Sequence, residues 1–143
     1  MKFQLSTAGM QEFTNVLLRM SDPSVFAGAV TEALTTAGEI AVQRLQEAAD
    51  QYHGGHSGRM RDSITASRPT INEYGGYLTV QLKGVVSGKW RYRDQGAELN
   101  FGSDRRKHPS GWFDKGQEKA QPEVEQAMVN VLEAWISSID GVA

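Results

Sequence analysis

The chain has no cysteine, no long apolar run and no signal-like start, and each absence removes a class of protein. Without cysteine there are no disulfides and no thiolate zinc sites, so folding needs no oxidising compartment. The sequence contains no run of about 18 apolar residues, so we expect no transmembrane helix. Residues Met1–Ser6 lack the apolar core of a signal peptide. We therefore expect a soluble protein without a membrane partner.

Motifs that mark common active sites are also missing. The sequence contains no Gly-x-Ser-x-Gly nucleophile elbow and no Gly-x-x-x-x-Gly-Lys-Ser/Thr phosphate loop. Its three histidines are His53, His56 and His108. One interpretation is that these histidines form a zinc site. However, His53 and His56 flank glycines in a predicted loop, which gives them no rigid support. The simpler interpretation is that they are exposed loop histidines. We expect no enzyme activity, no cofactor and no metal.

The 143 residues have the size of one domain, 1–143, and their charges are segregated along the chain. Residues 1–50 carry three basic and six acidic side chains, residues 51–110 carry ten and five, and residues 111–143 carry two and six. A basic middle between acidic flanks suits head-to-tail contact between subunits, a nucleic-acid surface or a plain solvated face. Nucleic acid ranks last of these, because the net charge of −2 opposes phosphate binding.

Helical periodicity dominates both ends of the chain. Ser6 or Thr7 caps a first short helix, whose apolar residues recur at three- and four-residue steps: Met10, Phe13, Leu17 and Met20. Asp22-Pro23 is typical of an N-cap followed by proline in the first turn, and predicts a long, alanine-rich helix to about Asp50. A last helix starts between Gly111 and Lys115, and Pro122 is expected to kink or restart it.

The middle of the chain alternates between turn signals and strand patterns. Residues 51–56 read as a loop and Ser63–Thr70 as a strand that stops near Pro69. After a turn at residues 72–76, a second strand runs over Tyr77–Val85 with three residues on one buried face: Leu78, Val80 and Leu82. Residues 89–93 alternate again, and residues 94–111 look irregular or short-helical. The fold class is therefore α+β, with a long N-terminal helix and a C-terminal helix packed on a small antiparallel sheet.

The segment Ser57-Gly58-Arg59-Met60-Arg61-Asp62-Ser63-Ile64 joins the long helix to the hairpin. Ser57 is placed to cap one helical turn, and Met60 and Ile64, four residues apart, would hold that turn on the core. Arg59 and Arg61 would then point outward, with Asp62 within reach of either. Taken alone, the segment is equally well a plain corner between helix and sheet.

A second signature begins at Leu99-Asn100-Phe101-Gly102-Ser103 and continues through the basic run Arg105-Arg106-Lys107 to Pro109-Ser110-Gly111-Trp112-Phe113. Basic and aromatic residues together can bind single-stranded nucleic acid by charge and stacking. The simpler interpretation is that Trp112 and Phe113 head the last helix and anchor it in the core or an interface.

Both signatures, in this order, resemble the tail-completion proteins, also called head–tail joining or neck proteins, of long-tailed phages and prophages. The Ser57–Ile64 corner is similar to the family's "T/S-G-x-L-R-x-S-I". Leu99–Ser103 stands at "V-E-F-G-T" and Pro109–Phe113 at "P-x-x-F-L". Glu98 and Asn100 replace the family's usual tyrosine and glutamate, and Gly116 falls near its usual "P-A".

The resemblance implies a non-enzymatic phage tail component that is made in the bacterial cytoplasm and resides in the tail or neck of the virion. Its partners would be further copies of itself, in a ring that is often sixfold, and the tail tube, its terminator or the head connector. Nucleic acid would be met only as DNA passing through the ring. The loop Ser103–Lys107 is the implied docking element. The expected interface residues are Arg59, Arg61, Arg93, Arg105, Arg106 and Lys107, with Trp112 and Phe113 as anchors.

Overall fold

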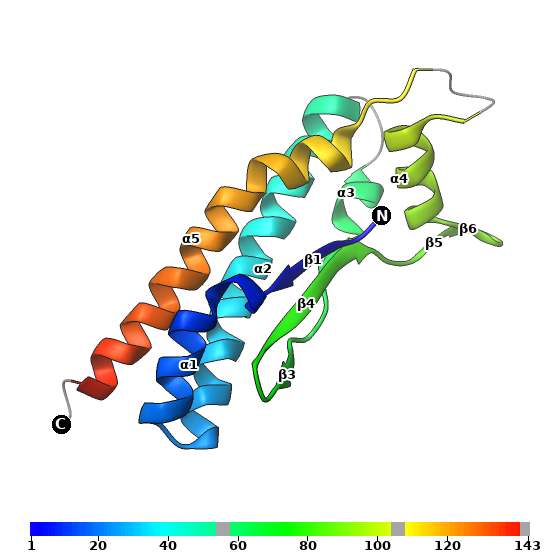
Figure 1. Ribbon diagram of the computed structural model, residues 1–143. Coiled ribbons are helices and arrows are strands. Elements are labelled where there is room, and N and C mark those ends of the chain that lie inside the picture. Colours follow the sequence, from blue (N-terminus) through cyan, green and yellow to red (C-terminus); the bar gives the residue numbers. More distant parts are fainter. Residues whose placement is uncertain (54–57, 104–107, 141–143) are drawn as a thin grey trace.

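The computed structural model describes residues 1–53, 58–103 and 108–140, and two long helices lie side by side with a small sheet against them (Figure 1). The elements in chain order are β1 (Phe3–Ser6), a 3₁₀ turn η1 (Ala8–Met10), α1 (Gln11–Met20), α2 (Pro23–His53), α3 (Gly58–Asp62), β2 (Ile64–Ala66), β3 (Thr70–Asn72), β4 (Gly75–Leu82), β5 (Val85–Ser87), β6 (Trp90–Arg91), α4 (Tyr92–Phe101) and α5 (Trp112–Asp140). The α+β class predicted from the sequence is confirmed.

Helix α2 begins as its sequence predicts. The Asp22 carboxylate accepts a hydrogen bond from the Val25 backbone N–H at 3.0 Å and another from the Ser24 hydroxyl at 2.6 Å. Pro23 occupies the first helical position, where a missing N–H costs nothing. The predicted end is wrong, because the helix continues to His53 instead of giving way to a loop at Gln51. The first glycines of the predicted loop, Gly54 and Gly55, come only after His53. Gln51, Tyr52 and His53 are residue types that are compatible with a helix.

The alanine-rich stripe of α2 brings α5 close. Its buried small residues are Ala29, Ala33, Ala37, Ala41, Ala48 and Ala49. Gly116 of α5 sits against this stripe, and a Cβ built on it would lie 2.9 Å from the Cβ of Ala48 and 3.0 Å from Leu45 Cδ2. Small residues on both helices therefore allow the two backbones to approach closely along their length (Figure 1).

Strand β4 is the centre of the sheet. It pairs antiparallel with β1 on one edge (Phe3 opposite Val80) and with β2 and β3 in succession on the other. Three of its alternate residues are buried, as the sequence predicted: Leu78, Val80 and Leu82. That buried face packs against α2, while the opposite face carries polar side chains.

Within the strand predicted over Ser63–Thr70, only β2 and the first residue of β3 are strand. The last residue of β3 and the first two residues of β4 lie in the segment 72–76 that was predicted to be a turn. Pro69 lies in the gap between β2 and β3, where its missing N–H removes a ladder hydrogen bond. Ser67 bridges the gap, because its N–H donates to the Thr79 carbonyl at 2.8 Å and its hydroxyl accepts from the Thr79 N–H at 3.0 Å. The break predicted near Pro69 is thus correct, but pairing resumes beyond it.

Two elements differ from the sequence-based expectation. Strand β1 was not expected, since only Phe3 and Leu5 carry its buried face in a four-residue segment. Thr7 extends its pairing, because its hydroxyl accepts from the Gly76 N–H at 3.0 Å rather than capping a helix. The alternating segment 89–93 is mostly not strand, since β6 ends at Arg91 and α4 begins at Tyr92.

The start of the last helix is confirmed, since α5 begins at Trp112. It runs through Pro122 as one continuous helix, so the predicted restart there is wrong. Pro122 lies on the exposed side of α5, where water can solvate the carbonyl that proline leaves without a donor. In α1, Met20 belongs to the helical apolar pattern but is 43% exposed in the last turn.

Gly116→Ala should destabilise the protein even though alanine favours helix. The added methyl meets the Ala48 Cβ, which is fixed to the backbone of α2, so the helices must move apart. We expect the free energy of unfolding in urea to fall by about 1–2 kcal/mol after the propensity gain is subtracted. The matched control is Gly9→Ala, where an added Cβ meets nothing within 4 Å. Equal stability of the two variants would contradict the close packing of α2 and α5.

Stability should also fall in acid through Asp22. Hydrogen bonds from Ser24 and from the Val25 backbone lower the pKa of Asp22 below its ordinary value of 3.8. A carboxylate with a depressed folded-state pKa contributes stability above the unfolded-state value, and that contribution is lost as the pH falls through the folded-state pKa. Asp22→Ser keeps a capping oxygen but cannot titrate there. Unfolding measured from pH 6 to about pH 2 should show a smaller acid loss for Asp22→Ser than for the wild type, and identical profiles would contradict this role.

Candidate interaction surface

The Ser57–Ile64 corner is a structural joint. Ser57 lies outside the described residues, but Met60 and Ile64 are 4% and 2% exposed, so the predicted anchors are confirmed. The Ser63 hydroxyl donates to the Met60 carbonyl at 2.6 Å, and the Ser63 carbonyl accepts from the Lys83 N–H at 2.9 Å. The corner thus ties the turn of α3 directly to the end of β4.

The two corner arginines have different surroundings. Arg61 donates to Asp50 at 3.0 Å and to Asp62 at 3.4 Å. The Asp50 carboxylate is the main cause of a raised pKa for the Arg61 guanidinium. Because these groups are exposed, the pairs contribute little stability. They do hold Arg61 beside the last turns of α2, and Arg59 is exposed as well.

The other predicted contact residues are spread out. Arg93 lies exposed at the start of α4, with its Nε 3.8 Å from the Asp94 carboxylate. Arg105, Arg106 and Lys107 lie outside the described residues, so the structure does not place the implied docking loop.

Trp112 and Phe113 lie inside the subunit, not on its surface. They are 0% and 1% exposed, with their rings edge to face at a centroid distance of 5.4 Å. The Trp112 indole N–H donates to the Gly96 carbonyl of α4 at 3.0 Å. They anchor α5 in the core, and their burial removes them from the expected set of interface residues.

Asn100 is a residue that sequence reasoning noted only as a departure from the family pattern. It is 2% exposed, and its amide oxygen accepts from the backbone N–H groups of Phe113 at 2.9 Å and Asp114 at 3.2 Å. Its amide NH₂ donates to the Asp114 carboxylate at 3.2 Å. Asn100 therefore caps the N-terminus of α5 from α4, so its position in the second signature has a structural cause.

The described residues contain no group of three potential metal ligands. His56 and the side chain of His53 lie outside the description, so the zinc interpretation stays untested. By length and apolar content alone, Pro23–Gln51 of α2 is compatible with a membrane span, unlike the sequence-based expectation. In this fold α5 and the sheet cover much of its apolar stripe, as expected for the core helix of a globular domain.

The most exposed apolar ribbon is the β5–β6 hairpin, Val85–Arg91, which we call the hairpin arm. It projects from the body beyond α4 (Figure 1). Val85, Val86 and Trp90 are 54%, 38% and 40% exposed. Lys89 and Arg91, both exposed, add positive charge. The arm thus combines apolar area with basic groups.

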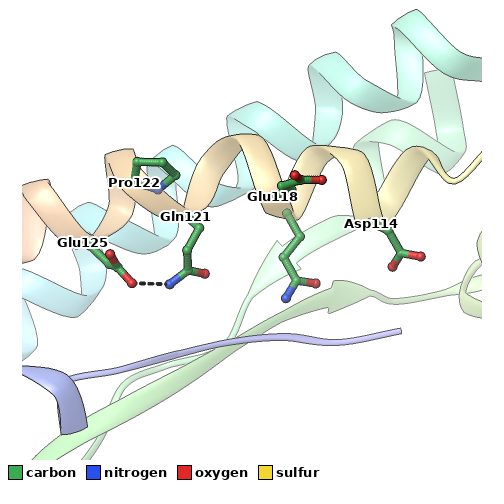
Figure 2. A pocket seen from close by; sticks show the side chains of 6 residues that line it. Asp114, Glu118, Gln121, Pro122 and Glu125 are labelled. Carbon is green, nitrogen blue, oxygen red and sulfur yellow. Dashed lines mark hydrogen bonds between the residues drawn. The ribbon is translucent and has the colours of Figure 1, made fainter.

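A second surface lies on α5, and we call it the α5 acidic face. It consists of Asp114, Glu118, Gln121, Pro122 and Glu125, which line one shallow groove with Gln117. Figure 2 shows these side chains along one side of the helix, with Gln121 donating to Glu125 at 2.6 Å. The face offers carboxylates beside an exposed proline ring.

Asn100→Ala should destabilise α5 at its start. The backbone N–H groups of Phe113 and Asp114 would be left buried without an acceptor, which costs about 2–3 kcal/mol in the free energy of unfolding. Asn72→Ala is the matched control, since the exposed Asn72 amide accepts a hydrogen bond from the Tyr74 N–H at 2.9 Å, and its loss should cost less than about 1 kcal/mol. Chemical denaturation of both variants measures the difference, and equal losses would contradict a capping role.

No family model, curated protein or solved structure matches this chain. Function is therefore inferred from the two signatures and from the two exposed surfaces.

Proposed function

We propose that this protein is a structural component of a long-tailed phage or prophage virion, which completes the tail or joins head to tail. It acts by assembling with copies of itself and docking on the end of the tail tube or on the connector. The observation that carries the proposal is that both signatures serve as joints of the fold in the order of the resembling family. The corner joins α3 to β4, and Trp112 of the second signature joins the start of α5 to α4 through the Gly96 carbonyl.

The surface supports an assembly role. A projecting arm with exposed valines and a tryptophan is costly for an isolated subunit, because apolar area remains in contact with water. Binding to a partner would remove that cost. The acidic face of α5 offers a second, chemically different surface, so each subunit carries two surfaces suited to contacts within an assembly.

A nucleic-acid-binding module is the second candidate. The arm places Trp90 between Lys89 and Arg91, and an aromatic ring flanked by cations can stack on an unpaired base and contact its phosphates. Such binding would weaken steeply with salt, because each neutralised phosphate releases a counterion.

Electron microscopy of the protein with purified tail tubes separates the two candidates. We expect density at one end of the tubes when the protein is added, and bare ends without it. Binding of single-stranded DNA is measured in parallel at low and high salt. A protein that decorates neither tubes nor connectors but binds DNA with a steep salt dependence would overturn the virion role in favour of nucleic-acid binding. A monomer in solution does not contradict the proposal, because such parts can assemble only on their template.

A further inference from the structure

The hairpin arm is a surface without cover in the described subunit. All the residues of its two strands are exposed, so both faces of the ribbon are in water. Two-stranded ribbons are marginally stable by themselves. The base is held, since the Tyr92 N–H donates to the Gly84 carbonyl at 3.1 Å, while among the described residues no backbone hydrogen bond from outside the hairpin reaches Val85–Trp90. The arm is therefore built to be completed by something outside the subunit.

The charges of the arm define its complement. Between Lys83 and Arg93 the chain carries Lys89 and Arg91 and no acidic residue. Two arms of the same charge would repel each other, so a symmetric arm-to-arm contact is disfavoured. The complement must offer carboxylates together with a small apolar area that can receive a tryptophan ring.

The α5 acidic face offers these groups. Glu118 and Glu125 are exposed on either side of Pro122, whose ring is a flat apolar patch that an indole can cover (Figure 2). The nearby Glu123 is already engaged by Arg44 at 2.8 Å, and Lys115 is turned to the Ser110 carbonyl at 2.9 Å. Lys115 keeps its positive charge beside that carbonyl, so Lys115 and Lys119 are both neighbouring cations whose charge works against a basic partner.

The arm and the α5 acidic face cannot meet within one subunit. In Figure 1 the arm extends away from the sheet on one side, while α5 borders the other side of the molecule. Contact between them therefore needs two copies. One such contact uses the arm of one copy and the acidic face of the other, and it leaves the remaining arm and the remaining acidic face open for a further contact.

We propose that the hairpin arm of one copy docks on the α5 acidic face of a second copy. Trp90 covers Pro122, and Lys89, in the turn beside it, pairs with Glu118 or Glu125. Arg91 follows Trp90 in β6 and lies on the other face of the ribbon, where it adds positive charge that attracts the acidic face. Repeated head-to-tail contacts close into a ring where the rotation between copies allows it. The arm is small, so one contact alone is weak, and ring closure or a template supplies the rest through multivalency. The proposal rests on the assembly role proposed above and names the subunit contact within it.

Two complementary variants test the contact. The double variant Trp90→Ala/Arg91→Ala removes the arm's contacts but keeps the acidic face. The double variant Glu118→Lys/Glu125→Lys removes the acidic face but keeps the arm. By sedimentation at up to about 1 mM, the wild type should self-associate in a concentration-dependent way. Each double variant alone should self-associate at least about tenfold more weakly. An equal mixture should form a dimer containing one copy of each, because one intact arm and one intact face remain. Recovery in the mixture also shows that both variants are folded.

Matched controls change similar residues elsewhere. Tyr74→Ala removes an aromatic ring that is 64% exposed in the turn between β3 and β4, and Glu12→Lys reverses an exposed charge on α1. Both should associate like the wild type. A wild type that stays monomeric at about 1 mM, a mixture that does not pair, or an acidic-face variant that associates normally would each overturn the contact. Failure of the virion role shows separately, as self-association without decoration of tubes or connectors.

Discussion

Helices α2 and α5 approach closely because both present small residues where they touch, and the positions of the other elements follow from this contact. The alanines of α2 and Gly116 of α5 lie so close that an added methyl on Gly116 would meet Ala48 at 2.9 Å. The sheet then packs its buried face, led by Leu78, on α2, and a Cβ on Gly38 would lie 3.1 Å from Leu78 Cδ2. Helix α2 thus packs closely against both α5 and the sheet.

The two signatures hold the ends of this framework in register. The corner connects α3 to β4 through the Ser63 carbonyl, and Asn100 connects α4 to the start of α5 through two backbone N–H groups. Trp112 adds a third link through the Gly96 carbonyl. These links are made inside the subunit, and the surface carries an apolar, basic arm and an acidic helix face beside other exposed apolar side chains such as Phe101 and Tyr74. Signatures that serve the fold and a surface that is left for contacts suit a protein that acts by binding neighbouring subunits in an assembly.

Much of the fold was predictable because its determinants are local. The Asp22-Pro23 start of α2, the buried face of β4 and the start of α5 follow from capping and periodicity. Strand β1 was missed, and helix α4 was anticipated only as irregular or short-helical sequence over residues 94–111, because tertiary contacts decide both. A four-residue strand shows too little alternation, and α4 buries Gly96, Leu99 and Asn100 at helical spacing, where glycine and asparagine do not register as apolar. The candidate interaction surface was harder to predict, because it also depends on tertiary contacts. Trp112 and Phe113 were rightly expected as anchors, but their pattern alone could not separate core from interface, and the arm was not singled out because exposure is a property of the whole fold.

The central claim is that arms and acidic faces of neighbouring copies join this protein into an assembly of the virion. Its most direct test is zero-length carbodiimide cross-linking of the protein bound to tail tubes, using a mixture of isotopically light and heavy subunits read by mass spectrometry. The account predicts mixed-isotope cross-links that join Lys89 to Glu118 or Glu125 of another copy. Tube-bound protein whose mixed-isotope cross-links all lie elsewhere, or whose Lys89 cross-links stay within one subunit, would contradict it.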